Sequence, residues 1–388
     1  MNPDGRMVPL LPTLSPSALL RRADSTWRAW FPFCDGAHWT FNGRVALYHG
    51  LPSLNLPRGS TILVPPYHQG VEIDTLLAAG HRIRYYRLGE QLVLDLADVE
   101  RRLDETVSAL YVIHYFGFPQ PLRLARSFCD AHRIALIEDC ALSLFSRDDG
   151  VWLGSVGDLA LFSAYKTLAL PHGGLLVTKE KRTRPSLRPA PLGSSLAQTL
   201  DLLHEGLKAS GRRRTERWLT WATGWAAAAI RWKRSRMVSS GTGEWDPRLL
   251  AYGASLWAAW LTRRVDPAEV VAKRRQNFER LASRLHGRLS LPFPVLPPGT
   301  CPLFLPIIVP DKARFQKGLA RQGVQSGDWW SRSHPTCPPG LAWEIAGWRR
   351  HCLELPIHQA LSPEDIDRIA EAVVRVLDDA ETVKRLRP

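Results

Sequence analysis

The sequence predicts an α/β fold, with a large domain built on a mainly parallel central sheet and a small C-terminal α+β domain. Two observations support this prediction. Apolar runs alternate with helical stretches between about residues 43 and 178, and several runs lack the polar alternation of strands that face water. The chain also has 388 residues, more than a single hydrophobic core usually accommodates. We expect the large domain at 1–260 and the small domain at 261–388.

The elements follow in order along the chain. An N-terminal arm is expected at 1–40, and a helical segment rich in Trp and Arg at about 195–260. The strands of the large sheet are expected at 61–67, 81–88, 108–116, 133–141, 158–166 and 174–178. After a proline-rich stretch, the small domain is predicted to have strands at 303–309 and 351–359, a helix at 312–323 and a closing helix whose N-cap is Ser362.

The composition is that of an ordinary globular protein, with 45% apolar and 23% charged residues. The six cysteines form no CxxC pair, and no apolar run is long enough to span a membrane, so we expect a cytoplasmic protein. The net charge is +14, but nine basic residues and one acid lie between Lys208 and Arg236 alone. Because no zinc-finger or basic-region pattern accompanies this charge, we expect no nucleic-acid partner.

Four tryptophans in this basic segment project to one side of a helix, namely Trp218, Trp221, Trp225 and Trp232. Such a stripe favours packing on the large domain or across a dimer. Because basic residues lie away from the stripe, peripheral contact with a membrane surface is the alternative.

An acid and a lysine follow neighbouring strands of the predicted sheet. Asp139 closes the strand RIALIED, and Lys166 comes after the strand LALFSAY, 27 positions later. Ligands of such sheets gather beyond the carboxyl ends of the strands, so both side chains are expected at one edge. This pair suits pyridoxal phosphate, because a carboxylate keeps the pyridine nitrogen protonated while a lysine amine forms a Schiff base. Taken singly, a strand-end cap and a surface lysine are the simpler interpretations.

The surrounding segments IEDCALSL, GSVGDLALFSAYKTLALPHGGLLVT and HYFGFPQP resemble the DegT/StrS-type sugar aminotransferases. The resemblance extends over roughly residues 40–180 and 265–375. It implies an aspartate-aminotransferase-like large domain, bound pyridoxal 5'-phosphate and a homodimer.

The resemblance also implies roles for individual residues. Lys166 would hold the cofactor as a Schiff base and Asp139 would contact the pyridinium nitrogen. The backbone amides around Gly43, Arg44 and Val45, with the Ser163 hydroxyl, would bind the phosphate. The stacking aromatic of the family falls near Gln69, so Tyr67 or His68 would replace it. In the small domain, Arg332, His334 and His358 are candidates for substrate contact, with ordinary packing as the alternative. No metal is expected.

Four departures from the family pattern bear on function. Arg44 and Val45 stand where Ser or Thr is usual, Leu142 replaces a usual Gln, Gln69 falls at the aromatic position, and fewer residues separate Ser163 from Lys166. The leading interpretation is an aminotransferase that aminates a nucleotide-linked keto-sugar with a donor such as glutamate. The alternatives are an enzyme of the same fold acting on a non-sugar substrate, and a catalytically decayed binding or regulatory protein.

Overall fold

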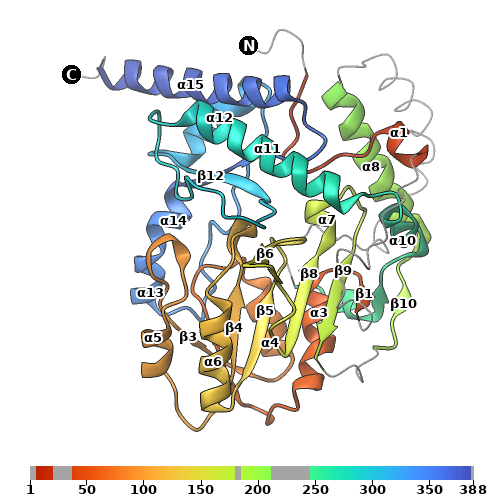
Figure 1. The fold of residues 1–388 in the computed structure, drawn as a ribbon, viewed down its shortest axis with the longest axis vertical. Helices are drawn as coiled ribbons and strands as arrows, with labels where there is room; N and C mark the ends of the chain where they lie inside the picture. Colours follow the sequence, from red (N-terminus) through yellow and green to blue (C-terminus); the bar gives the residue numbers. More distant parts are fainter. Residues whose placement is uncertain (1–5, 21–36, 180–184, 211–244, 386–388) are drawn as a thin grey trace.

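The computed structural model describes residues 6–20, 37–179, 185–210 and 245–385. Figure 1 shows a strand-rich lower part, with the C-terminal elements above it and the last helix running across the top. The tryptophans 218, 221, 225 and 232 and their basic neighbours lie outside the described residues. Within the described ranges, no helix combines the length and apolar character needed to cross a membrane.

A nine-stranded sheet forms the centre of the lower part, in the order β10-β11-β1-β9-β8-β5-β4-β2-β3. The strands β3, β2, β4, β5 and β8 are mutually parallel, whereas β9 is antiparallel to both β8 and β1. Their bounds are β1 His38–Thr40, β2 Thr61–Val64, β3 Arg82–Tyr85, β4 Val107–Ile113, β5 Ala135–Asp139, β8 Leu159–Ser163, β9 Gly174–Thr178, β10 Arg188–Pro189 and β11 Tyr252–Gly253. The six strands predicted from sequence and the mainly parallel sheet are confirmed.

The expected N-terminal arm at 1–40 ends earlier than predicted, because residues 38–40 pair with β9 as an edge of the sheet. A hairpin of two short strands, β6 Arg147–Asp148 and β7 Val151–Trp152, separates β5 from β8. The 19 residues between β5 and β8, 140–158, would be hard to place from the apolar pattern alone, since each hairpin strand has only two residues.

Helices cover both faces of the sheet, as continuous apolar strands require. On one face, Ala46 and Leu47 of α3 and Ile73 of α4 share a buried cluster with Tyr111 of β4 and Ile137 of β5. On the other face, Val99 of α5 and Cys129 of α6 pack with Leu110 of β4 and Leu136 of β5. The covering helices are α3 Gly43–Gly50, α4 Val71–Ala78, α5 Leu96–Arg101 and α6 Leu122–His132.

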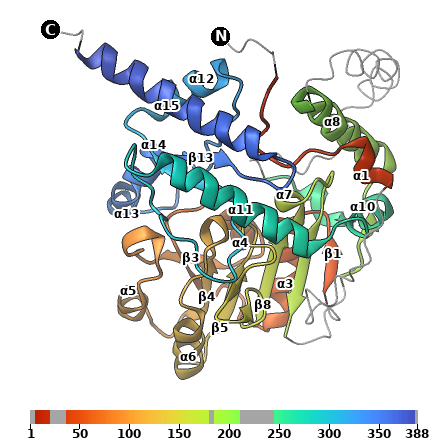
Figure 2. The ribbon, with the colours of Figure 1, turned by 45° about the horizontal axis from the view of Figure 1, so that its top comes forward.

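The C-terminal part contains the two-stranded antiparallel sheet of β12 and β13. Helices α11 and α15 lie side by side over it in Figures 1 and 2. The bounds are α11 Pro267–Leu285, β12 Phe304–Ile308, α12 Lys312–Arg321, α13 Pro339–Glu344, α14 Ala346–His351, β13 Cys352–Pro356 and α15 Pro363–Arg385. The predicted boundary at residue 260 falls inside a helix, α10, so the division at 260/261 stays a prediction.

The remaining helices lie at the other end of the sheet and are α1 Pro16–Leu20, α8 Leu192–Ser210 and α10 Leu256–Thr262. The Trp257 indole donates to Thr199 Oγ1 at 2.9 Å and so joins α10 to α8. The described residues of the Trp/Arg-rich segment are mainly helical, and β11 also lies among them. The short helix α7, Ala164–Thr167, follows β8 directly and contains Lys166.

Candidate active site

A cavity of about 270 Å³ opens at the carboxyl ends of β4, β5 and β8, beside the first turn of α3. Strand alternation explains its lining. Tyr111, Asp139 and Ser163 occupy odd positions on three neighbouring parallel strands, so their side chains share one face and reach one edge. Lys166 lines the same cavity. The structure thus brings the predicted acid and lysine together.

Lys166 is half-buried in the wall of the cavity. Desolvation, with the nearby charge of Arg44, lowers the pKa of its ammonium group, while Asp139 and Glu72 act in the opposite direction. Its Nζ lies 5.0 Å from the centre of the Trp329 ring. A lysine with a lowered pKa has a larger fraction of neutral amine, which is the form that attacks a carbonyl carbon.

The next residue, Thr167, anchors the lysine segment to the C-terminal part. Its carbonyl oxygen accepts a hydrogen bond from Arg274 at 2.9 Å and from Gln359 Nε2 at 3.0 Å. Arg274 is fully buried and also donates to the carbonyl oxygens of Pro302 and Leu303. Helix α11 therefore holds the backbone beside Lys166 in place.

Asp139 has hydrogen bonds to both of its carboxylate oxygens. Oδ1 accepts from the backbone amide of Ala141 at 2.8 Å, and Oδ2 accepts from the Tyr111 hydroxyl at 2.5 Å. Burial raises the pKa of Asp139, and these two donors with Lys166 counteract the rise. The carboxylate retains lone pairs toward the cavity, since each oxygen can accept two hydrogen bonds.

The first turn of α3 and the end of β8 form the other side of the cavity. Gly43, Arg44 and Ser163 all line it. A Cβ at Gly43 would lie 2.7 Å from Ser163 Oγ, so only glycine fits this close approach. The Asn42 side chain caps α3 by accepting from the Val45 amide at 3.2 Å, while its Nδ2 is buried and has no partner among the described residues.

This geometry corrects the expected phosphate contact at Val45. Its amide already donates to Asn42, and its side chain is fully buried in an apolar cluster with Phe41 and Leu249. Asn42, which also lines the cavity, was not identified from sequence. Its position before a glycine and an apolar helix is a recognisable N-cap pattern, which could have indicated it.

The expectation that Tyr67 or His68 stacks on a ligand ring is also corrected. Tyr67 is fully buried and packs edge-on against Trp330, with the ring centres 5.0 Å apart. His68 is buried against Tyr85 at 5.9 Å. Both are absent from the cavity wall, where Gln69 is found instead. The loop between β2 and α4 turns these two rings into the core.

Glu72 is a cavity residue that sequence reasoning missed. It lies in the first turn of α4, and its Oε1 accepts from the Gln69 amide at 2.9 Å. Burial, with Asp139 nearby, raises the pKa of its carboxyl group. Trp329 and Trp330 also line the cavity, which brings the C-terminal part against the sheet.

The three residues predicted to contact substrate all lie outside this cavity. The Arg332 side chain is exposed, and its carbonyl oxygen accepts from Arg349 at 2.5 Å. His334 hydrogen-bonds to Asp74 at 3.1 Å. His358 is buried and donates to the carbonyl oxygen of Pro9 at 3.1 Å. Burial lowers the pKa of His358 to about 3, so its ring is neutral at neutral pH. A substrate role for these residues remains untested.

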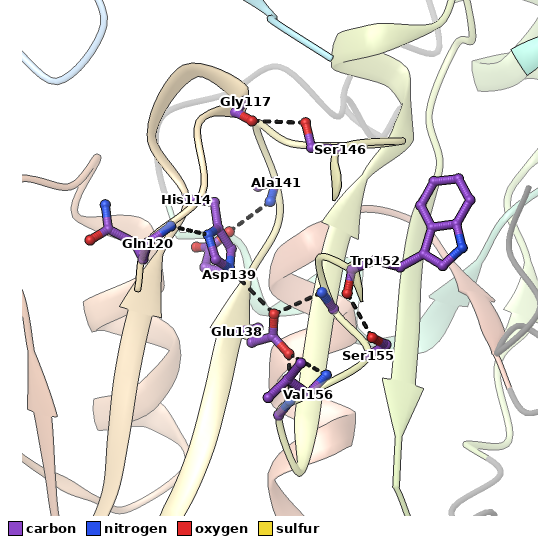
Figure 3. A network of polar contacts seen from close by, with 12 residues as sticks. His114, Gly117, Gln120, Glu138, Asp139, Ala141, Ser146, Trp152, Ser155 and Val156 are labelled. Atoms are coloured by element: carbon purple, nitrogen blue, oxygen red, sulfur yellow. Dashed lines mark hydrogen bonds and ion pairs between the residues drawn. The ribbon is translucent and has the colours of Figure 1, made fainter. Parts of the chain in front are cut away.

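A separate polar network lies on the opposite face of β5 (Figure 3). The ligand atoms of His114, Glu138 and Cys140 lie within 4.8 Å of one another, as in a metal site. However, Glu138 accepts hydrogen bonds from the backbone amides of Gly154 and Val156 and contacts His114 Nε2 at 3.3 Å. These bonds fix the turn that leads into β8, so we interpret the cluster as structural.

Comparison with known proteins agrees with this geometry. Residues 37–217 match the model of the DegT/DnrJ/EryC1/StrS aminotransferase family. GDP-perosamine synthase of Vibrio cholerae is 29% identical over 140 residues, which cover 35% of this chain and 38% of that protein. The erythromycin biosynthesis sensory transduction protein EryC1 of Saccharopolyspora erythraea is 30% identical over 165 residues, covering 40% and 44%. The chain thus spans about two fifths of the length of the curated relatives it matches.

Among solved structures, the aminotransferase TlmJ from Streptoalloteichus hindustanus superposes with a TM-score of 0.63 at 20% identity, covering 97% of this chain and 100% of that one. This likeness extends the fold assignment beyond the sequence match, through the C-terminal part. Over residues 37–217, the chain is similar to the DegT/DnrJ/EryC1/StrS aminotransferase family.

Proposed function

We propose that the protein is a pyridoxal-phosphate-dependent aminotransferase that aminates a keto-sugar, in nucleotide-linked form, with an amino-acid donor such as glutamate. The observation that supports it most directly is the shared cavity of Asp139 and Lys166. The first is a buried carboxylate held by two donors, and the second is a half-buried lysine with a lowered pKa. The similarity to the aminotransferase family over residues 37–217 agrees with this chemistry.

The residues present fit pyridoxal phosphate. The side chain of Asn42 has a buried, unpartnered Nδ2 in the cavity wall, which is a donor in need of an acceptor. Gly43 and Arg44 at the start of α3 and the Ser163 hydroxyl lie on the same side, as an anion site requires. Asp139 lies deeper, at the end of β5. These groups match the phosphate end and the ring nitrogen of one ligand.

When bound, the cofactor supplies an electron sink and a carrier for the amino group. The chain's own residues perform the remaining tasks. Asp139 would hold a proton on the ring nitrogen, and Arg44 with Ser163 would bind the phosphate. Lys166 would hold the cofactor covalently and, once displaced by an amine, move a proton in both half-reactions. Trp329, which lies against Lys166, would exclude water from this amine.

The keto-sugar part of the proposal is supported by the name of one relative, GDP-perosamine synthase, because perosamine is an amino sugar carried on a nucleotide. Two alternatives remain distinct from it. An enzyme of this fold acting on a non-sugar carbonyl would use the same Asp139 and Lys166. A decayed binding protein is disfavoured by the half-buried lysine and the intact carboxylate.

A homodimer and a cytoplasmic location complete the proposal. The five described cysteines are all buried and free, which agrees with a reducing compartment. Light scattering coupled to size exclusion would measure the assembly, and a mass of one chain would contradict the dimer.

The first experiment follows the visible absorbance of the purified protein mixed with pyridoxal phosphate. We expect a band that an amino donor bleaches and that Lys166→Ala abolishes. Lys179→Ala is the matched control, because Lys179 is a largely exposed lysine whose nearest acidic partner is Asp158 at 3.7 Å. A band that survives in Lys166→Ala contradicts the assignment of Lys166.

A second experiment identifies the acceptor. Glutamate consumption is measured with a panel of keto-sugar nucleotides and simple ketones. Turnover of the nucleotide-linked sugars supports the proposal, whereas turnover of the simple ketones alone supports the non-sugar alternative. A stable Lys166-dependent band without turnover of any acceptor or bleaching by any donor supports the decayed protein.

A further inference from the structure

Tyr111 is a cavity residue whose hydroxyl group contacts the carboxylate of Asp139. It lies on β4, is fully buried, and donates to Asp139 Oδ2 at 2.5 Å. Such short hydrogen bonds to a charged oxygen are among the strong ones in proteins. The pair spans two adjacent strands whose register places Ile113 opposite Asp139 and Tyr111 opposite Ile137. Tyr111 therefore reaches forward, toward the carboxyl end of the sheet, to meet the carboxylate.

We propose that Tyr111 is a positioning residue that keeps Asp139 charged and oriented toward the cofactor ring. This inference rests on the proposed function, since it requires pyridoxal phosphate in the cavity. A proton shared between the ring nitrogen and Asp139 can lie on either partner. A donor on the carboxylate stabilises its charged form and thereby leaves the proton on the nitrogen, where it strengthens the electron sink.

Burial of Asp139 and a second carboxyl group nearby make the Tyr111 hydroxyl necessary as a donor. Asp139 is fully buried, and burial alone favours the neutral carboxyl group. Glu72 adds a second carboxyl group to the same cavity; Asp139 raises the pKa of Glu72, and Glu72 raises the pKa of Tyr111. The Ala141 amide is the other hydrogen-bond donor to the carboxylate. Without the Tyr111 hydroxyl, one oxygen of Asp139 would lose its donor among the described residues.

Other titratable groups act on this pair from neighbouring elements, namely Glu72 of α4, His114 after β4 and Lys166 of α7. Arg44 of α3 acts on Lys166. Tyr111 itself stays protonated, because burial and the two carboxylates raise its pKa well above the ordinary value. It thus remains a hydrogen-bond donor over the whole accessible pH range.

The chain offers a matched control directly after β3, which is separated from β4 by β2. The Tyr86 hydroxyl is buried and donates to the backbone carbonyl oxygen of Tyr111 at 3.0 Å. Tyr86→Phe therefore removes a buried hydroxyl that contacts the same residue without touching Asp139. Tyr111→Phe removes the donor to the carboxylate and keeps the ring. Comparison of the two separates an effect on Asp139 from a loss of packing or stability.

The test titrates the visible band of the protein loaded with pyridoxal phosphate. Positive charge on the ring nitrogen repels a proton on the lysine-cofactor linkage, so loss of that charge should raise the pKa of the linkage. We expect Tyr111→Phe to move the titration midpoint upward by about one pH unit. With ¹⁵N-labelled cofactor, its ring-nitrogen resonance should move toward the unprotonated position. Tyr86→Phe should leave both readouts unchanged.

Each outcome has a distinct meaning. If Tyr111→Phe titrates like the unmodified protein, with the nitrogen still fully protonated, this inference is wrong while the cofactor proposal stands. Equal shifts in Tyr86→Phe and Tyr111→Phe also overturn it, because the cause would then be the loss of any nearby hydroxyl. A protein that forms no Lys166-dependent band overturns the proposed function itself, and this inference with it.

Discussion

Arg274 donates a hydrogen bond to the carbonyl oxygen of Thr167 at 2.9 Å, and Thr167 directly follows Lys166. Helices α11 and α7, which are distant in sequence, thus meet beside the candidate catalytic lysine. Burial lowers the pKa of Arg274 to about 10, which still leaves it charged at neutral pH. Its acceptors are uncharged, so they stabilise its charge through backbone and side-chain dipoles.

Arg274→Met is expected to weaken cofactor attachment and to destabilise the fold. Each carbonyl oxygen left without a donor in a buried site costs about 1–3 kcal/mol. Melting temperature and the cofactor dissociation constant measure the two effects. Arg275→Met is the control, since Arg275 bonds to Pro297 and Thr300 on the far side of α11. Equal cofactor affinity in both variants would contradict a positioning role for Arg274.

Gly43→Ala is expected to weaken pyridoxal phosphate binding, because the new methyl group would lie 2.7 Å from Ser163 Oγ. Overpacking of this kind costs about 1–3 kcal/mol, which corresponds to roughly tenfold weaker affinity or more. Gly193→Ala on α8 has open space around the new methyl group and should leave affinity unchanged. Equilibrium titration of the visible band measures both. Unchanged affinity in Gly43→Ala would place the phosphate elsewhere.

Arg44→Gln tests whether this arginine binds the phosphate by its charge. We expect weaker binding of pyridoxal phosphate and little change for pyridoxal, which lacks the phosphate. In this variant, the difference in affinity between pyridoxal phosphate and pyridoxal should also depend less on ionic strength, because salt screens charge pairs. Arg58→Gln, at an exposed position away from the cavity, is the control. An equal loss for both ligands would mean that Arg44 acts on the ring or on Lys166.

Glu354 on β13 should make stability depend on pH. It is fully buried, and burial raises the pKa of its carboxyl group from 4.5 to about 7. The folded chain therefore binds more protons than the unfolded chain between these pH values. Its contribution to stability is complete below about pH 4.5 and is lost as the pH rises to about 7, by roughly 3 kcal/mol.

Glu354→Gln removes this titration while keeping an oxygen that can accept from the Trp329 amide. Between about pH 4.5 and pH 7, the unfolding free energy of the unmodified protein should fall relative to that of this variant. The exposed Glu344→Gln, whose partner is Arg87, should show no such trend. Parallel stability curves for Glu354→Gln and the unmodified protein would show that Glu354 is ionised in the fold.

Local sequence was sufficient for the strands, for the closing helix and for the pair of Asp139 and Lys166. Apolar runs and strand ends are properties of short segments, and parallel strands bring their carboxyl ends to one edge whatever the rest of the chain does. The resemblance also indicated Gly43, Arg44 and Ser163, which the structure places around one cavity.

Tertiary structure alone decided which side chains complete that cavity. Tyr67 and His68 were expected at a ring but turn into the core, whereas Gln69 of the same loop and Glu72 of α4 line the cavity. Tyr111 meets Asp139 only because of strand register, and Arg274 meets Thr167 only because α11 packs against the lysine segment. Such contacts depend on the relative placement of elements distant in sequence, which a local pattern of apolar and polar residues does not encode.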